Sequence, residues 1–347
     1  MKNGALSTFR VVTVSAALHF LVDALCLCCL YLLASPVGFE GVLGVFITYN
    51  VLAFLTQPLT GAIADRVKHG HWLLLTAVVL LTLGVLATSL VTLLLPPSTL
   101  HPEPSTLTGW TLTAILLGMG NSLFHVWGGR LVAVQSGNDM RALGIFVSTG
   151  AFGLAVGMVF YSWLLVYAML IAICGLALCF AVKESQPSTL HLPPSTFHPY
   201  PSTLHLSPST IVFLLLILLV VAGRSLLGQQ FSASIPQPSS VMLLAIGALA
   251  MIGKMAGGWL CRWMGIIKAM AFVVVIVAVC WLFTIGGVWQ MENGEWKVAT
   301  VLLGLFAVNC TMPVTLYLAN VLLPKHEGFA FGLLAAALIP GYLLAFI

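Results

Sequence analysis

The chain has 347 residues, of which 60% are hydrophobic and only 6% are charged. A water-soluble protein of this size needs far more polar side chains on its surface, so the composition excludes a soluble globular domain. The formal net charge of +4 is small and spread over the segments between apolar runs, which argues against nucleic acid as a partner. We therefore expect an all-α integral membrane protein that crosses the lipid bilayer several times.

Apolar runs of about twenty residues predict the membrane-spanning helices. These runs lie near residues 11–34, 41–64, 72–95, 107–129, 142–182, 211–231, 241–260, 269–290, 298–323 and 328–347. The run at 142–182 is long enough for two helices that turn near Ser162. The sequence therefore predicts eleven helices, six followed by five.

Lysine and arginine lie mainly in alternate loops, and this bias predicts the orientation, because cytoplasmic loops carry the excess of these residues. One set of loops holds Lys2, Arg10, Arg66, Lys68, Arg130, Arg141, Lys183, Arg262, Lys268 and Lys325. The other set holds Glu40, Glu103, Glu292, Glu295 and Lys297. The N-terminus is thus expected in the cytoplasm and, after an odd number of spans, the C-terminus outside.

A seven-residue repeat that begins Pro-Ser-Thr occupies two of the predicted loops. Its copies begin at Pro97 and Pro104 in the external loop 96–106, and at the prolines 187, 194, 201 and 208 in the central cytoplasmic loop. A proline at every seventh position removes helical hydrogen bonds, so both stretches are expected to be extended or disordered. The same repeat on opposite faces is better explained by tandem duplication in tolerant loops than by a shared binding role.

The central repeat divides the chain into residues 1–185, a linker at 186–210, and residues 211–347. Histidines at 191, 198 and 205 follow the period of the repeat, and we do not assign them to a metal. All eight cysteines lie in or beside predicted spans without CxxC pairing, which favours packing over metal or redox chemistry. We expect neither a metal site nor a cofactor.

Two related motifs close the second and the eighth apolar runs. Gly61-Ala62-Ile63-Ala64-Asp65-Arg66 and Gly257-Gly258-Trp259-Leu260-Cys261-Arg262 share the pattern Gly-x-x-x-(Asp or Cys)-Arg. With the six-plus-five topology, this duplication resembles the major facilitator superfamily. The resemblance implies two helical bundles, alternating access, a cavity lined by helices one, four, seven and ten, and a twelfth helix that is missing here. It also implies a cytoplasmic gate at Gly61, Asp65, Arg66, Gly257 and Arg262, of which only the first copy has the acid.

A narrower resemblance lies in span four, where Gly120-Asn121-Ser122-Leu123-Phe124-His125 is similar to a signature of fosmidomycin-resistance-type exporters. Gly150, Gly153 and Gly157 in span five are similar to the glycine-rich motif of antiporters, although the proline usual in that motif is missing. Both resemblances suggest antiport.

Ionisable groups inside a span are costly and are functional candidates by default. His19 and Asp23 are four residues apart, so they share one face of a helix and can exchange a proton. Asp23 lies about 18 Å from the cytoplasmic Arg10, which is near the middle of the membrane. Asn121 and His125 in span four form a second such pair, for which a purely structural hydrogen-bonding role is the alternative.

Arg224 in span seven cannot easily reach the membrane surface, so it is expected to pair with Asp23 or with an anionic substrate. Lys254 in span eight can either act in the cavity or reach toward the cytoplasmic end, and the sequence favours neither role. In span ten, Asn309, Thr311, Tyr317 and Asn320 are weaker cavity candidates. Pro313 is expected to bend that span.

These features predict a secondary transporter in the bacterial plasma membrane, in which Asp23 and His19 carry protons and a small organic molecule is exported in exchange. The chain is expected to act as a monomer. The alternative is a proton-coupled importer of a small organic anion. An intramembrane enzyme built on His19, Asp23 and His125, or a channel, is more remote, because the chain contains neither a His-Glu-x-x-His string nor a filter-like loop.

Overall fold

The computed structural model describes residues 2–35, 38, 42–94, 104–185, 206–284 and 294–344. Within these residues the regular structure is entirely helical. The helices of the N-terminal half are α1 Lys2–Ala34, α3 Leu43–Asn50, η1 Val51–Leu55, α4 Gln57–Ala64, α5 His71–Leu94, α6 Pro104–Gln135, α7 Met140–Val159 and α8 Trp163–Ser185. Those of the C-terminal half are α9 Pro208–Ala233, α10 Ser240–Met264, α11 Ile266–Thr284, α12 Gly294–Asn309, α13 Met312–Leu322, α14 Glu327–Ala336 and α15 Ile339–Leu344.

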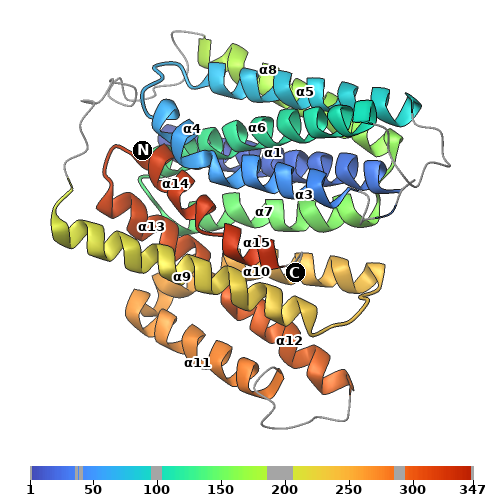
Figure 1. Ribbon diagram of the computed structural model, residues 1–347. Coiled ribbons are helices and arrows are strands. Elements are labelled where there is room, and N and C mark those ends of the chain that lie inside the picture. The colour runs from blue at the N-terminus through green and yellow to red at the C-terminus, as the bar shows by residue number, and fades with distance from the viewer. Residues whose placement is uncertain are drawn as a thin grey trace.

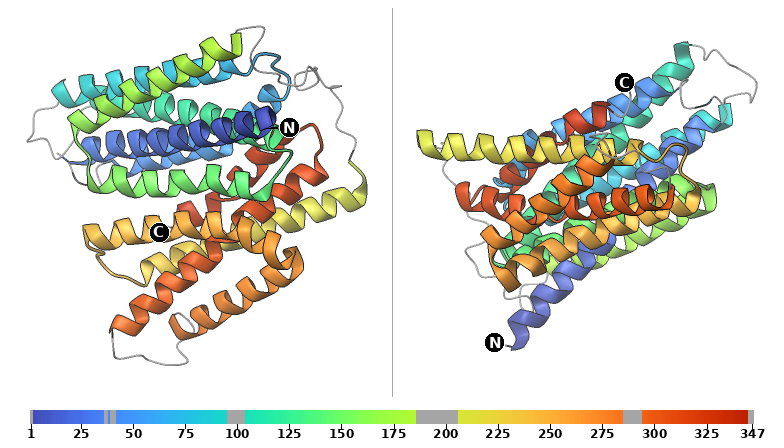
Figure 2. Two further views of the ribbon diagram at one scale, coloured as in Figure 1. Left: turned by 180° about the vertical axis from the view of Figure 1, so that it is seen from behind. Right: turned by 90° about the horizontal axis from the view of Figure 1, so that it is seen from below.

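The two halves of the chain form two bundles that lie side by side, with their helices roughly parallel to a common direction (Figures 1 and 2). The bundles meet along two helix pairs, α7 with α10 and α4 with α14. The largest core cluster lies inside the N-terminal bundle and continues onto α9, α13 and α14. The interface between the bundles is therefore formed mainly by these four helices, two from each half of the chain.

The helices agree closely with the predicted spans. Nine helical segments of the described residues are long and apolar enough to cross a membrane. The other two predicted spans are α6, whose centre carries polar side chains, and the short apolar segment Glu327–Leu343. The turn expected near Ser162 is confirmed, because α7 ends at Val159 and α8 begins at Trp163.

Three prolines interrupt spans that the hydropathy pattern shows as continuous, because proline cannot donate to the carbonyl four residues before it. Before Pro58 the second span widens into the π-helical turn η1. Before Pro313 the tenth span divides into α12 and α13, which confirms the expected bend. Before Pro340 the last span divides into α14 and α15. Interrupted spans are tolerated in a membrane where they line a cavity.

The proline repeats differ from the prediction at their last copies. Pro104 is the first residue of α6, and Pro208 begins α9, where the side chain of Ser207 accepts a hydrogen bond from the amide of Thr210. Proline fits the first turn of a helix, because its missing N–H would have no helical partner there. The remaining repeats, their histidines and most of the predicted linker lie outside the described residues.

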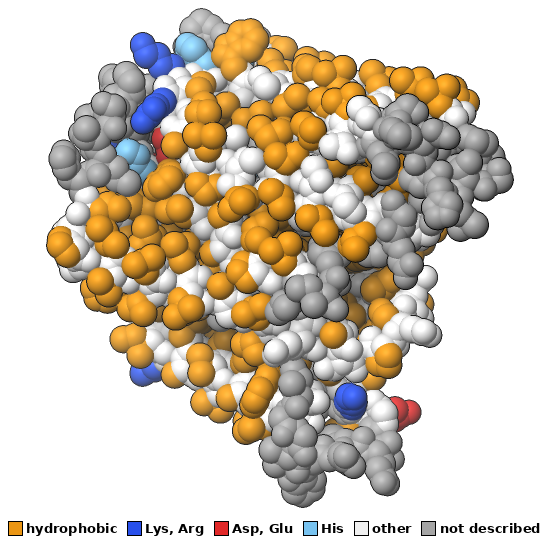
Figure 3. Space-filling model, viewed as in Figure 1, with side chains coloured by type: hydrophobic (Ala, Val, Ile, Leu, Met, Phe, Trp, Pro, Cys, Tyr) orange, Lys and Arg blue, Asp and Glu red, His pale blue; other side chains and the backbone are white. Residues whose placement is uncertain are grey.

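The molecular surface is that of a membrane protein. Hydrophobic side chains cover most of the face in Figure 3, and the visible lysine, arginine and acidic side chains lie toward its edges. Large apolar side chains such as Leu164 and Trp263 are 83% exposed. Lipid tails would cover this surface, in agreement with the composition.

Candidate transport site

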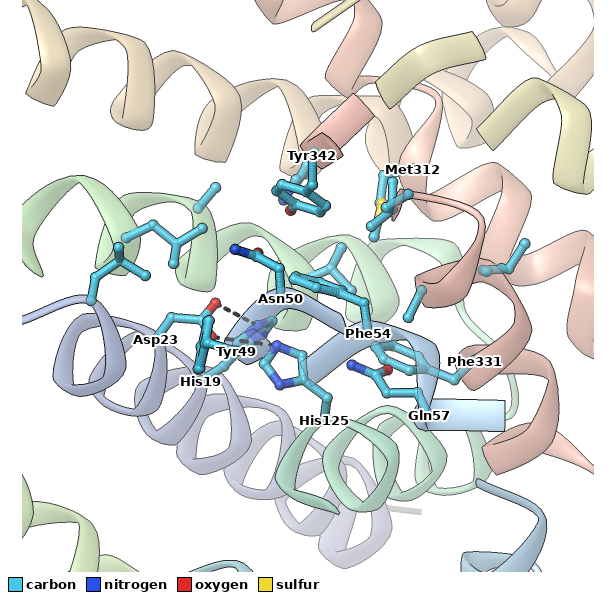
Figure 4. Close-up of a pocket in the computed structure, with 18 of the residues that line it drawn as sticks. His19, Asp23, Tyr49, Asn50, Phe54, Gln57, His125, Met312, Phe331 and Tyr342 are labelled. Atoms are coloured by element: carbon cyan, nitrogen blue, oxygen red, sulfur yellow. Dashed lines mark ion pairs between the residues drawn. The ribbon is translucent and has the colours of Figure 1, made fainter. Parts of the chain in front are cut away.

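A cavity of about 300 Å³ lies between the two bundles. Its wall on one side comes from α1, α3, η1, α4, α6 and α7, and on the other side from α10, α13, α14 and α15. Figure 4 shows Tyr342 and Met312 facing the side chains of the N-terminal bundle across this space. The rings of Phe54 and Tyr342 stack at 4.5 Å between centroids and so link the two bundles.

A cluster of one carboxylate and two imidazoles forms the polar part of the cavity wall. Asp23 Oδ2 lies 3.3 Å from His19 Nε2, and Asp23 Oδ1 lies 3.5 Å from His125 Nε2 (Figure 4). All three residues are less than 10% exposed. The sequence paired His19 with Asp23 and His125 with Asn121; the fold joins all of them, because α1 packs against α6.

Backbone carbonyls orient both histidine rings. His19 Nδ1 lies 2.7 Å from the carbonyl oxygen of Phe146, and His125 Nδ1 lies 2.9 Å from that of Asn121. A carbonyl only accepts, so each Nδ1 carries a hydrogen and each Nε2 is left to face the carboxylate. A proton between a ring and Asp23 can thus lie on either partner: an imidazolium donates from Nε2 to the carboxylate, or a protonated carboxyl donates to the Nε2 of a neutral ring.

Two neighbours fit closely around this cluster. The amide of Asn121 donates from Nδ2 to Asp23 Oδ1 at 3.0 Å, so Asn121 supports the carboxylate from behind and is not among the lining residues. A Cβ at Gly150 of α7 would overlap with Asp23 Oδ2 and His19 Nε2. Gly153 and Gly157 continue this contact along α1. The glycine series of span five therefore brings α7 against the ionisable face of α1.

The same three side chains could also hold a metal ion, because their ligand atoms all lie within 4.8 Å of one another. Histidine ligands in metal sites commonly donate their second ring nitrogen to a carbonyl, as both do here. From the sequence we expected no metal site, because the chain contains no His-Glu-x-x-His string, and we considered His125 together with His19 and Asp23 only as a remote intramembrane enzyme.

The two cations of the C-terminal bundle occupy different positions. Lys254 of α10 lines the cavity, whereas Arg224 of α9 is 9% exposed, does not line the cavity and lies within electrostatic range of Tyr342. The expected pairing of Arg224 with Asp23 is wrong in this conformation: its Nη1 is buried without a hydrogen-bond partner among the described residues. Lys254 lies within electrostatic range of both Asp23 and Arg224.

The polar residues of span ten lie outside the cavity, contrary to expectation. Asn309 donates from its amide to the carbonyl of Leu305 in its own helix, and the hydroxyl of Thr311 donates to the carbonyl of Val308. The carbonyl of Tyr317 and the amide of Asn320 bond to Asn138, in the turn between α6 and α7. From this span, Met312 and Leu316 line the cavity instead.

The first Gly-x-x-x-Asp-Arg motif connects the two bundles. Asp65 accepts hydrogen bonds from the amides of Gly328 and Phe329, at 2.9 and 2.8 Å, and thereby caps the first turn of α14. The guanidinium against Asp65 is that of Arg130, at 3.1 Å from Nε to Oδ1, whereas Arg66 is exposed. Burial raises the pKa of the Asp65 carboxyl, while the two amides and Arg130 act in the opposite direction.

Motif glycines allow the helices to cross at backbone contact. A Cβ at Gly61 would overlap with the carbonyl of Gly328 in α14. In the second copy, a Cβ at Gly257 would overlap with the carbonyl of Cys310, and one at Gly258 would lie too close to the carbonyl of Met140 in α7. Each motif therefore marks a crossing where α4 meets α14 or α10 meets α7.

The second motif has Cys261 in place of an acid, so it cannot cap the helix that it meets, and the N-terminus of α7 is capped by Asp139 instead. Asp139 is the N-cap of α7: it accepts from the amide of Arg141 and forms an ion pair with the side chain of the same residue. These hydrogen bonds lower the pKa of Asp139. The guanidinium of Arg141 also lies over the ring of Trp259, 5.3 Å from its centroid, and Arg262 is exposed nearby. Only the first motif thus joins the bundles through a carboxylate.

The sequence missed several wall residues. Tyr49, Phe54 and Tyr342 carry no spacing that distinguishes them from packing aromatics, and their position depends on the proline breaks. Arg130 was assigned only to orientation. Arg130 follows the Gly-Asn-x-x-Phe-His string by little more than one helical turn, and this position was the available sequence signal for a functional role.

A family model described as Major Facilitator Superfamily matches residues 8–345, nearly the whole chain. The chain belongs to this superfamily. It is accordingly a multi-pass membrane transporter of small molecules and not an enzyme, and the expected two-bundle fold is confirmed.

Solved structures show the same fold. The E. coli fucose:proton symporter is 13% identical with a TM-score of 0.66, and the match covers 97% of this chain and 90% of the symporter. The human organic anion transporter MFSD10 is 19% identical with a TM-score of 0.64, over 97% and 92% of the two chains. A bacterial homologue of the iron transporter ferroportin, in an outward-facing state, is 14% identical with a TM-score of 0.64, over 97% and 91%.

No curated protein sequence gives a significant match to this superfamily member. The narrower resemblance to fosmidomycin-resistance-type exporters therefore stays a prediction. So do the direction of transport and the coupling ion.

Proposed function

We propose that this superfamily member is a proton-coupled antiporter that exports a small organic molecule, with Asp23 as the proton-binding group and His19 as its relay. The observation that carries the proposal is the His19–Asp23–His125 cluster on the cavity wall. Asp23 is the only acid among the described lining residues. Because both Nε2 atoms face its carboxylate, one proton changes the charge of the cluster by one unit without moving a helix.

The conformation supports alternating access. At one end, Asp65 caps α14 and closes the contact between the bundles. Toward the other end, the cavity extends past Tyr31 in the last turn of α1 and Met158 near the end of α7. With the N-terminus in the cytoplasm of a bacterial cell, as the lysine and arginine bias predicts, this state faces outward.

Transport then requires the Asp65–α14 contact to open while the opposite end closes. The glycine crossing at Gly61 lies in this same contact of α4 with α14, so it separates together with Asp65 as the bundles rock against each other. Gly61, Asp65, Gly257 and the exposed Arg66 and Arg262 form the gate region in this proposal. Gate opening separates Asp65 from α14 and leaves the proton-binding cluster intact within the N-terminal bundle.

The test is reconstitution of the purified chain in proteoliposomes with an internal pH-sensitive dye and an imposed pH gradient. Substrate addition is expected to collapse the gradient in the wild type, and Asp23→Asn is expected to abolish this response. Asp139→Asn is the matched control, since it removes a carboxylate outside the cavity. Proton flux in Asp23→Asn equal to that of the wild type would contradict the proposal.

A second candidate is a proton-coupled importer of a small organic anion that uses the same cavity. The positive charge of Lys254 and Arg224 in the C-terminal bundle favours it. Under this alternative, Arg224→Ala weakens transport of anionic compounds more than of neutral ones. Two measurements in expressing cells separate import from export: uptake of labelled metabolites indicates an importer, and decreased drug susceptibility indicates an exporter.

A further inference from the structure

Lys254 lies on the cavity wall with its backbone fixed at the interface between the bundles. It is ten residues before the end of α10 at Met264, which places its Cα about 15 Å inside that end of the helix. A Cβ at Gly144 of α7 would lie too close to the carbonyl of Lys254, so the two helices touch at this level. The position of the lysine is therefore set by packing, and the side chain has the cavity in front of it.

The charges around the cavity do not balance. The single acid of the described wall, Asp23, is already occupied by His19, His125 and Asn121. Lys254 forms no ion pair within 4.0 Å among the described residues. The buried Nη1 of Arg224, which lies within electrostatic range of Tyr342, also lacks a hydrogen-bond partner among the described residues. Two cations inside a membrane without a bonded anion are costly, so the site is built to receive one.

We infer that Lys254 binds the anionic group of the transported molecule, and that the substrates are small organic anions with an apolar body. This inference rests on the proposed transport function and names its substrate class. Lys254 binds the anion directly, and the buried Arg224, which lies within electrostatic range of Lys254 and Tyr342, adds positive potential. The apolar body lies against a wall in which hydrophobic side chains predominate, among them Phe54, Met312 and Leu338. A sugar, which needs many hydrogen-bonding partners, does not fit such a wall.

The test measures binding to the full-length chain in detergent at one fixed pH, without a gradient. The probes are three pairs in which a carboxylate is matched with its neutral amide: benzoate and benzamide, naphthalene-2-carboxylate and its carboxamide, octanoate and octanamide. The wild type is expected to prefer the acid of at least one pair. Lys254→Gln should reduce that preference about tenfold to a hundredfold, the loss of one charge-assisted hydrogen bond.

Lys254→Arg keeps the charge and should retain most of the preference, and unchanged amide binding shows that the variants are folded. Lys268→Gln removes an exposed lysine from α11 and should leave the preference unchanged. The inference is overturned if the wild type prefers the carboxylate in none of the three pairs, or if Lys254→Gln keeps the wild-type preference.

The experiments distinguish failure of the anion site at Lys254 from failure of proton coupling at Asp23. Asp23→Asn should lose proton-driven flux and keep the preference for carboxylates, because Lys254 is unchanged. A wild type without proton-driven flux, but with carboxylate preference that depends on Lys254, would refute proton coupling alone. A wild type with proton-driven flux and no carboxylate preference would refute the anion site alone.

Discussion

Asp65→Asn is the perturbation with the clearest expected effect on the conformational equilibrium. The carboxylate accepts from two backbone amides of α14, at 2.9 and 2.8 Å, and Asp65 is only 3% exposed. Asparagine keeps one acceptor oxygen, so one amide bond and the negative charge at the N-terminus of α14 are lost.

A hydrogen bond to a charged group stabilises by about 1.5–3 kcal/mol, and the charge at a helix N-terminus adds about 0.3–1 kcal/mol. The closed contact should therefore weaken by about 2–4 kcal/mol. At about 1.4 kcal/mol for each factor of ten, the open population rises about thirtyfold to seven-hundredfold. Thermodynamically, the loss affects only the conformation in which Asp65 meets α14.

Hydrogen–deuterium exchange with mass spectrometry measures this opening without labels. At pH 8, which keeps the carboxyl ionised despite its raised pKa, Asp65→Asn should accelerate exchange in peptides covering both α4 and α14. Asp139→Asn, which removes the negative charge at the N-cap of α7 and its ion pair with Arg141, should leave both peptides unchanged. Unchanged exchange in Asp65→Asn, or acceleration confined to the first turn of α14, would refute the idea that Asp65 holds the bundles together.

Three further predictions follow from the site and its surroundings. Gly150→Ala places a methyl group onto the His19–Asp23 pair and should abolish proton-driven flux while the protein remains membrane-inserted; wild-type flux would show that α7 is farther from the pair than the structure places it. The lowered pKa of Asp139 means that its stabilising effect is present above about pH 4 and lost as the pH falls through the lowered value. The difference in melting temperature between wild type and Asp139→Asn should thus be constant from pH 5 to 8 and shrink below pH 4; a difference that persists in more acidic buffer would argue against a charge-dependent cap. Treatment with EDTA should leave proton-driven flux unchanged, and inhibition reversed by added Zn²⁺ would instead indicate that the His19–Asp23–His125 cluster works as a metal site.

The outline of this fold depends on local sequence alone. A run of about twenty apolar residues has to be a helix in lipid, because the backbone polar groups must bond within the segment. Spans and their order were therefore predictable, as was the bend at Pro313, since a proline removes a specific helical hydrogen bond. The relation of His19 to Asp23 was predictable for the same reason, because both lie on one helix.

Only the tertiary structure decided which helices meet. The arrival of His125 at Asp23, the pairing of Asp65 with Arg130 and α14, and the separation of Arg224 from Asp23 all depend on contacts between segments distant in sequence. Hydropathy cannot specify these contacts, because every apolar helix is equally compatible with lipid; small residues and proline breaks set them. The sequence thus determined that the chain spans the membrane in two related halves, and packing decided which of its few polar groups share a site.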